Sequence, residues 1–273
     1  MRVVILTGSD LRHDFFRKSV ALNTSIEVVR SYCEFTSDKV RKVIDDSNRD
    51  SLLQIAHLRK RRFSEEDFFQ SLVELAPDNS SSKLVQYGAI NDEAIVSEIF
   101  DLKPDLLVAY GCSLVKSELL SKYAGHFVNV HLGLSPYYRG SGTNYWPLVN
   151  GEPEYVGATF MYIDAGIDTG EIIHQVRARC YEGDSPHQIG NRLIADMTRV
   201  YIDIILKHDS LKKMAQPSIS DDYRLYKRSE FSVESVVKLY DNFSSGMIEH
   251  YLDSYADRVA AVPIVENPDV ECV

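Results

Sequence analysis

Short apolar runs alternate with longer amphipathic segments along this 273-residue chain. The runs lie at residues 2–6, 25–32, 84–87, 105–109, 127–131, 156–163 and 171–176. Continuous apolar strands that alternate with helices are typical of a parallel sheet covered on both faces. We therefore predict an α/β fold, with a mostly parallel sheet and helices on both of its faces.

The strongest helix signal begins at Ser185. This residue is a good N-cap, Pro186 suits the first helical position, and Gln188 completes a capping box. Apolar residues then recur on one helical face, at positions 189, 193, 197, 200 and 204. We expect this face to pack on the sheet.

A charged segment at residues 36–75 is also expected to be helical. Within it, Ser64 has the features of an N-cap, with Phe63 and Phe68 at the spacing of a hydrophobic staple. The basic cluster at residues 59–62 precedes Ser64, and a solvated helix end explains that cluster most simply.

The composition becomes polar after Lys207, which indicates a boundary near residues 210–220. A last helix is predicted from Ser232, with Phe231 and Val236 as its staple. This helix is too short to form a core alone, so it should dock on the main domain or on a partner chain, and a homodimer stays open. The expected division is a main domain over 1–210, a short helical appendage over 220–260 and a loose tail over 261–273.

The bulk composition is that of a soluble globular protein, with 44% hydrophobic and 26% charged residues. No apolar run approaches the roughly 18 residues that span a bilayer, and the N-terminus does not have the pattern of a signal peptide, so we expect a cytoplasmic protein. The formal net charge of −10 argues against tRNA or another nucleic acid as a partner. The cysteines are far apart without a CxxC pair, so neither a disulfide framework nor a metal site is expected.

Two polar loops, at residues 129–140 and 164–170, each follow an apolar run and are punctuated by Gly or Pro. Ligands of open α/β sheets bind at the carboxyl ends of the strands, and Asn129 and His131 lie at such an end. Alternation along a strand points these two side chains to the same side. An amide donor and an imidazole would therefore converge on one ligand atom.

These residue types suit acid–base and oxyanion chemistry. His131 could take or give a proton near neutral pH, Asn129 could donate to an oxygen that gains negative charge, and Asp168 could orient the imidazole. No protein nucleophile is evident beside them, which favours direct transfer between two bound substrates. Taken singly, a His at a strand end is usually a surface residue and an Asp-x-Gly is usually a turn, but the joint pattern is far more specific.

The turn after the first strand, at residues 7–10, leads into a predicted helix. Such a strand, turn and helix can hold a phosphate at the helix N-terminus. One glycine is a weak signal, and a plain strand-to-helix turn is the more common explanation.

The two loops together form the pattern Asn-x-His-x-x-Leu-x-Pro-x-Tyr-Arg-Gly followed by Asp-x-Gly-x-Asp-Thr-Gly. This pattern resembles the folate-dependent formyltransferases, which include glycinamide ribonucleotide, methionyl-tRNA and sugar N-formyltransferases. The match extends to residues 108–111, 150–151 and 156–159. The resemblance implies a Rossmann-like fold and 10-formyltetrahydrofolate as the formyl donor.

The resemblance also implies roles for residues of both loops. Asn129, His131 and Asp168 would be the catalytic trio. The pterin of 10-formyltetrahydrofolate would be held by Tyr110, Gly111, Ile163, Asp164 and Gly166.

The chain departs from the family pattern at several points. Many members carry His-Pro-Ser-Leu-Leu-Pro, where this chain has His-Leu-Gly-Leu-Ser-Pro at residues 131–136. Methionyl-tRNA formyltransferases usually carry a larger, basic C-terminal domain, and purine-pathway members carry a Gly-rich loop after the first strand. The segments 140–146 and 226–231 look most like the members that act on nucleotide-linked amino sugars.

We therefore predict an N-formyltransferase for the primary amine of a nucleotide-linked amino sugar, as used in lipopolysaccharide biosynthesis. The residues expected to hold this acceptor are Ser9, Arg12, His13, Arg139 and Asn144. A structural salt bridge explains Arg139 equally well. Two alternatives stay open: a formyltransferase for methionyl-tRNA or a purine precursor, and a folate-binding relative without turnover.

Overall fold

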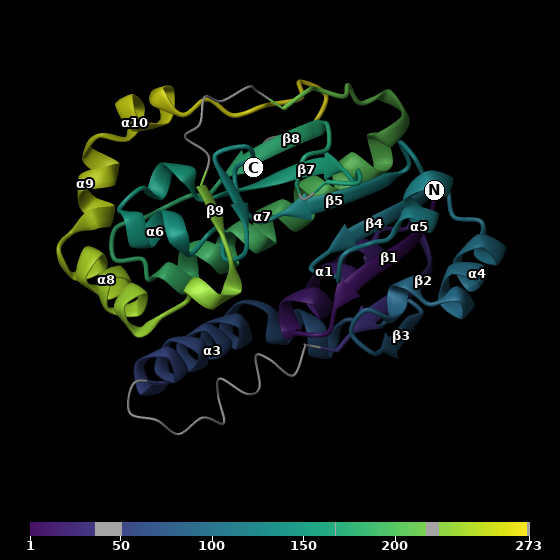
Figure 1. Ribbon diagram of the computed structural model, residues 1–273, viewed down its shortest axis with the longest axis horizontal. Helices are drawn as coiled ribbons and strands as arrows, with labels where there is room; N and C mark the ends of the chain where they lie inside the picture. The colour runs from purple at the N-terminus through teal and green to yellow at the C-terminus, as the bar shows by residue number, and fades with distance from the viewer. Residues whose placement is uncertain (36–50, 167, 217–223, 272–273) are drawn as a thin grey trace.

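The computed structural model describes residues 1–35, 51–166, 168–216 and 224–271, which include a seven-stranded sheet (Figure 1). Across the sheet the strands are β3 (Ser82–Val85), β2 (Glu27–Glu34), β1 (Arg2–Gly8), β4 (Leu106–Tyr110), β5 (Phe127–His131), β7 (Gly157–Tyr162) and β8 (Ile172–Arg177). The first five run parallel, whereas β7 is antiparallel to both β5 and β8. The predicted mostly parallel, Rossmann-like sheet is therefore confirmed.

Helices cover both faces of this sheet (Figure 1). The covering helices include α1 (Leu11–Leu22), α3 (Ser51–Leu75) and α7 (Pro186–Lys207) on one side, and α4 (Glu93–Leu102) and the short α5 (Ser117–Lys122) on the other. Val3 and Ile5 of β1 lie in the core beneath α1 and α7, whereas Val4 and Leu6 lie in the core beneath α4 and α5. Because both faces are buried, residues 3–6 of this strand are all apolar.

Helix α7 begins as the sequence predicts. The Ser185 hydroxyl accepts from the Gln188 backbone N–H at 3.3 Å, and the Gln188 side chain accepts from the Ser185 N–H at 2.9 Å. Leu193 and Met197 on its apolar face are fully buried. Within the described ranges, no helix combines the length and the apolar character needed to cross a bilayer.

Helix α3 corrects the prediction of a helix start at Ser64. The helix continues through this residue, whose hydroxyl accepts a hydrogen bond from Asn191 of α7 at 2.9 Å. The basic cluster at 59–62 lies inside the helix, where Arg61 pairs with Glu65 at the i, i+4 spacing that supports a continuous helix. Residues 36–50 of the predicted helix lie outside the described residues.

The chain after α7 adds short elements that sequence periodicity did not separate. They are η3 (His208–Ser210), β9 (Arg224–Tyr226), η4 (Arg228–Glu230), α8 (Val233–Ser244), α9 (Met247–Asp253) and α10 (Tyr255–Ala261). Ser232 caps α8 as predicted, and α8, α9 and α10 lie together along one end of the molecule (Figure 1). Residues 217–223 lie outside the described residues, so the boundary near 210–220 stays a prediction.

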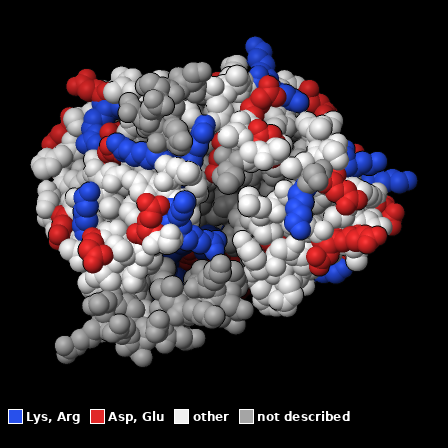
Figure 2. All heavy atoms as spheres, viewed as in Figure 1, with Lys and Arg blue, Asp and Glu red and all other residues white. Residues whose placement is uncertain are grey.

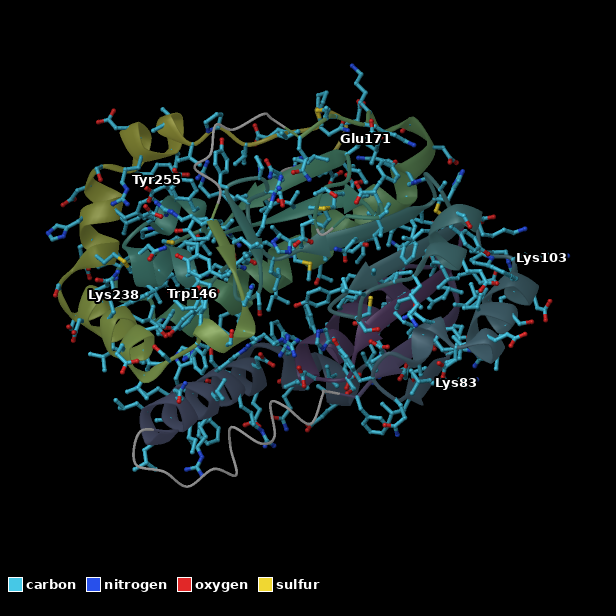
Figure 3. All side chains as sticks on the ribbon, viewed as in Figure 1. Lys83, Lys103, Trp146, Glu171, Lys238 and Tyr255 are labelled. Carbon is cyan, nitrogen blue, oxygen red and sulfur yellow. The ribbon has the colours of Figure 1, made fainter. Side chains whose placement is uncertain are left out.

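Strand β9 pairs with β6 (Tyr138–Gly140), which follows the loop of His131. Trp146, labelled in Figure 3, stacks on Tyr226 with 4.3 Å between ring centroids. This tryptophan begins α6 (Trp146–Asn150), which precedes the 3-10 helix η2 (Pro153–Tyr155); the remaining short helix is η1 (Ala89–Asn91). Asn150 donates to the hydroxyls of Tyr138 and Tyr226 at 2.9 Å each, which docks β9 onto the main sheet domain.

The described residues after α10, 262–271, lie against β8, whereas a loose tail was expected over 261–273. The Gln175 backbone N–H donates to the Val265 carbonyl at 2.7 Å, and the Asn267 N–H donates to His174 Nδ1 at 3.0 Å. Val270 is 5% exposed. The segment forms no helix or strand here, so its sequence shows no periodicity. Its backbone groups at Val265 and Asn267 are bound instead by Gln175 and His174 of β8.

Candidate active site

The two predicted loops meet at the end of β5. His131 Nδ1 lies 3.4 Å from Asp168 Oδ2, and the two side chains are 10% and 15% exposed. Asn129 lies two residues earlier on the same strand, so its side chain points to the same face as that of His131. The structure therefore brings His131 and Asp168 together and places Asn129 beside them.

Asp168 reaches His131 because the loop between β7 and β8 folds back. The loop starts beside β5, where the Ile163 N–H donates to the Phe127 carbonyl at 3.0 Å. His131 lies four residues farther along β5, so the loop must return over the strand. Asp168 has a positive φ of 54°, a conformation that Asp tolerates better than most residues.

Asp164 shapes this loop from within. Its Oδ1 accepts from the Gly166 N–H at 2.9 Å and from the Thr169 hydroxyl at 2.8 Å. A carboxylate that bonds the backbone two residues on is a common turn device. The Asp-x-Gly of the sequence motif is thus a turn that carries Asp168, and its proposed contact with the pterin stays a prediction.

Gly133 departs from the family pattern, and the space around it explains why a glycine is needed there. A Cβ added to Gly133 would lie 2.7 Å from both His131 Nε2 and the Thr143 Cβ, too close for either. The Thr143 hydroxyl in turn donates to the Leu132 carbonyl. His131 Nε2 is buried and has no hydrogen-bond partner within the described part of the chain. Gly133 therefore leaves the room that the imidazole occupies.

Two residues that were not predicted as site residues hold the loop after His131. The Thr159 hydroxyl donates to the Gly133 carbonyl at 2.6 Å and accepts from the Ser135 N–H at 3.0 Å. The Gln175 amide donates to the same hydroxyl at 2.9 Å and to the Ser135 carbonyl at 2.7 Å. Thr159 lies in the segment that matched the family, which was a usable signal, but Gln175 carried none.

The two predicted pterin residues at the end of β4 differ in exposure, because Tyr110 is buried whereas Gly111 is exposed. Tyr110 is 3% exposed, and its ring packs against His13 and Phe16 with centroids 4.9 and 5.4 Å apart. Burial raises the pKa of Tyr110 to about 12. Gly111 has a φ of 70°, and a Cβ there would lie 2.5 Å from His13 Nε2. A ligand at this position would meet the backbone of residues 110–111 and not the tyrosine ring.

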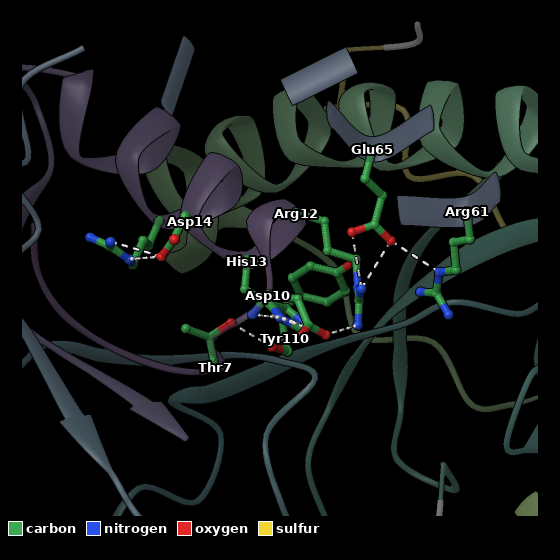
Figure 4. A network of polar contacts seen from close by, with 9 residues as sticks. Thr7, Asp10, Arg12, His13, Asp14, Arg61, Glu65 and Tyr110 are labelled. Carbon is green, nitrogen blue, oxygen red and sulfur yellow. Dashed lines mark hydrogen bonds and ion pairs between the residues drawn. The ribbon is translucent and has the colours of Figure 1, made fainter. Parts of the chain in front are cut away.

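At the turn after β1, charged residues of the turn, α1 and α3 pair with one another (Figure 4). Arg12 contacts Asp10 at 2.5 Å and Glu65 at 3.0 Å, and Glu65 also pairs with Arg61 at 3.0 Å. Burial disfavours the guanidinium of Arg12, but the carboxylates of Glu65 and Asp10 outweigh it and raise the pKa of Arg12. Burial and the neighbouring Arg12 lower the pKa of His13 well below its usual value.

Of the remaining acceptor candidates, one lines a cavity and two form hydrogen bonds within the protein. Ser9 lines a cavity of about 370 Å³ together with residues of α1, β2 and β3. Asn144 accepts from the Gly157 N–H at 3.1 Å, and Arg139 donates to Gln216 at 3.1 Å. Figure 2 shows a hollow near the centre of the face drawn, with basic side chains along part of its rim. Acceptor binding by any of these residues stays a prediction.

The model of the family described as Formyl transferase matches residues 38–205. The chain belongs to this formyl transferase family. The predicted family is thereby confirmed, and its members use formyl-tetrahydrofolate as the formyl donor.

Similar proteins with curated names include methionyl-tRNA formyltransferases. The one from Desulforamulus reducens is 34% identical over 144 residues, which cover 52% of this chain and 44% of that protein. The one from Finegoldia magna is 27% identical over 204 residues, which cover 71% of this chain and 64% of that protein. The matched part is therefore less than two thirds of the length of these relatives.

Solved structures show the same fold. A phosphoribosylglycinamide formyltransferase from Anaplasma phagocytophilum matches 83% of this chain and 98% of its own, with a TM-score of 0.54 and 15% identity. A sugar N-formyltransferase from a Shewanella species matches 85% of this chain and 78% of its own, with a TM-score of 0.53 and 19% identity. At such identities these matches concern the fold alone.

Proposed function

We propose that this protein is an N-formyltransferase that transfers the formyl group of 10-formyltetrahydrofolate to the primary amine of a nucleotide-linked amino sugar. The observation that carries the proposal is the pairing of His131 with Asp168, beside Asn129, within a chain of the formyl transferase family. Among the described residues, His131 Nε2 has no hydrogen bond to a hydroxyl or thiol that could act as a nucleophile, which suits direct transfer between two bound substrates.

The trio has separate tasks in this reaction. The acceptor nitrogen forms a bond to the formyl carbon, and the formyl oxygen becomes an oxyanion. Asn129 and protonated His131 stabilise that oxyanion, while Asp168 faces Nδ1 and favours the orientation in which Nε2 points away from it. The bond from the formyl carbon to the folate nitrogen then breaks, and one proton passes in balance from the amine to that nitrogen.

Charge supports a small acceptor over a tRNA. With a net charge of −10, the chain lacks the excess of Lys and Arg that phosphate backbones need for tight binding. The basic cluster of α3 is also partly neutralised, because Arg61 pairs with Glu65 and Arg62 with Glu66 at 3.1 Å. A nucleotide sugar needs few cations, so it fits the acidic surface better.

Formylation of methionyl-tRNA is the second candidate. It is favoured by the curated names of the relatives, one of them 34% identical over the matched segment. Those relatives are longer than the segment they share with this chain, so their substrate does not carry over directly.

A panel of acceptors tests both candidates. Purified protein is incubated with 10-formyltetrahydrofolate and amino-sugar nucleotides, methionyl-tRNA or glycinamide ribonucleotide, and tetrahydrofolate release is followed by absorbance. The Asn129→Ala variant is the matched control for uncatalysed formyl loss. Turnover with an amino-sugar nucleotide supports the proposal, turnover with methionyl-tRNA alone replaces it by the second candidate, and folate binding without turnover on any amine indicates a binding protein.

A further inference from the structure

Gln216 lies next to the site although it belongs to the segment after α7. Two residues earlier, Met214 exchanges both backbone hydrogen bonds with Ile172 at the start of β8, at 2.7 and 2.9 Å. This bridge fixes the path of the segment along the edge of the sheet. The Gln216 side chain is therefore directed at the loop that precedes Ile172, which is the loop of Asp168.

The Gln216 amide uses each of its polar groups. Its Nε2 donates to the Asp168 carbonyl at 2.8 Å and to the Gly170 carbonyl at 2.9 Å, and its Oε1 accepts from Arg139 Nη2 at 3.1 Å. Two carbonyl oxygens can only accept, and a guanidinium can only donate, so these neighbours fix the orientation of the amide.

These contacts join the two loops that carry the trio. The two carbonyls belong to Asp168 and Gly170, so the amide grips the backbone on both sides of Thr169. Arg139 belongs to β6, which follows the loop of His131. One side chain thus links the loop of the imidazole to the loop of the carboxylate.

The grip matters because most described residues of this loop are exposed. Residues 164–166 and 169 are exposed. Asp168 has a left-handed backbone conformation, which costs energy and persists only where surrounding contacts hold it. A change of backbone position at Asp168 would alter the 3.4 Å contact between its carboxylate and His131 Nδ1.

We propose that Gln216 is a positioning residue for the His131–Asp168 pair. It contacts no reacting atom itself and acts by fixing the backbone of Asp168 relative to the loop of His131. This inference rests on the proposed function only in the claim that the pair carries out the chemistry. The geometric claim can be tested without any acceptor.

The test variant is Gln216→Glu. Glutamate keeps the shape and can still accept from Arg139, but it has no N–H to give and would set a carboxylate oxygen against two carbonyl oxygens. We expect kcat to fall by roughly 10- to 100-fold, the scale of a misplacement of about 1 Å in a catalytic group, with a smaller change in the KM for the folate. Gln86→Glu, an exposed site between β3 and η1, makes the same change of charge as a matched control.

A second readout follows the imidazole directly. The ring ¹⁵N chemical shifts of His131, assigned with the His131→Ala variant, report which nitrogen carries the proton. Wild type and Gln86→Glu should give the same ring shifts. Gln216→Glu should give different shifts, because the Asp168 carboxylate would no longer face Nδ1 at the same distance. If it unfolds, the uncharged Gln216→Met carries the same test.

The outcomes separate the two proposals. Unchanged ring shifts in a folded Gln216 variant would overturn the positioning role, whatever the activity. Altered shifts in the Gln216 variant, together with a wild-type protein that formylates no amine, would leave the positioning role standing and remove the proposed function. In an active enzyme, Gln216→Glu should cost much less in the Asp168→Asn background, and an equal loss in both backgrounds would contradict action through Asp168.

Discussion

At the end of β1, Arg12 contacts both Asp10 and Glu65, and Glu65 also contacts Arg61. At the end of β5, His131 contacts Asp168 through Nδ1, while its buried Nε2 has no hydrogen-bond partner among the residues described. The first cluster compensates its own charges, as structural networks do. The second leaves a buried nitrogen unsatisfied, and such groups require an explanation, which a reacting substrate would supply.

The largest expected effect concerns turnover at the second cluster. Asn129→Ala removes an oxyanion donor and should lower kcat by roughly 10²- to 10³-fold, and His131→Ala should cost at least as much. Folate affinity should fall less than turnover. Steady-state kinetics with the acceptor found in the panel measures both, and circular dichroism checks the fold. Near-normal turnover in a folded His131→Ala protein would remove this residue from the mechanism.

The link between His131 and Asp168 can be tested by combining substitutions. Asp168→Asn keeps the shape of the side chain and removes its charge, so turnover should fall by a factor comparable to the loss in His131→Ala. The double variant should lose much less than the product of the two single losses, because residues that act as a unit are not additive. Multiplicative losses would show that the two side chains work independently.

Glu65 tests whether the first cluster is structural. Its side chain is 7% exposed, and its removal leaves the mostly buried Arg12 short of a partner. Glu65→Ala should therefore lower the free energy of unfolding by about 3 kcal/mol, while turnover per folded molecule changes little. Urea unfolding and active-site-normalised kinetics give the two numbers. The reverse result, normal stability with lost turnover, would move this cluster into the acceptor site.

A smaller effect should appear on acidification at His57 of α3. Burial, together with Arg61 and Lys60, lowers the pKa of His57 to about 4, from an ordinary value of 6.5. Between these values the unfolded chain binds a proton that the folded protein does not, so stability falls as pH falls. Lowering the pH from about 6.5 to about 5 should cost about 2 kcal/mol at this site.

His57→Phe is the matched variant for this prediction. It keeps a ring beside His187, whose centroid lies 4.6 Å from that of His57. Urea unfolding at several pH values should give a shallower pH dependence in the variant. His187, whose pKa burial lowers to about 3, would retain part of the slope. Identical slopes in both proteins would assign the acid sensitivity to other groups.

Local signals predicted some elements well. The cap and apolar face of α7 and the apolar runs of β4 and β5 follow from residues close in sequence. The same kind of signal was wrong at Ser64, because the ion pair of Arg61 with Glu65 and the contact with Asn191 support a helix that continues. A local cap motif cannot reveal a tertiary contact made elsewhere.

The residues of the candidate site also fall into those that the sequence predicted and those that it did not. The motif spacing indicated that His131 and Asp168 would meet, and the structure places them 3.4 Å apart. The motif spacing could not indicate Gln175 or Gln216, because each of them acts through hydrogen bonds to a loop 40 or more residues away in the sequence. An isolated glutamine in a polar segment has no period or spacing that marks such a contact.

The position of β8 at the end of the sheet gives the segment after α10 a further role. An uncovered edge strand can pair with the edge of another molecule, which is a route to aggregation. Here Met214 covers the edge at Ile172, and Val265 covers it at Gln175. The opposite edge is the four-residue β3, which carries Lys83. One edge is thus protected by its shortness and charge, and the other by two segments that block strand-to-strand association between molecules.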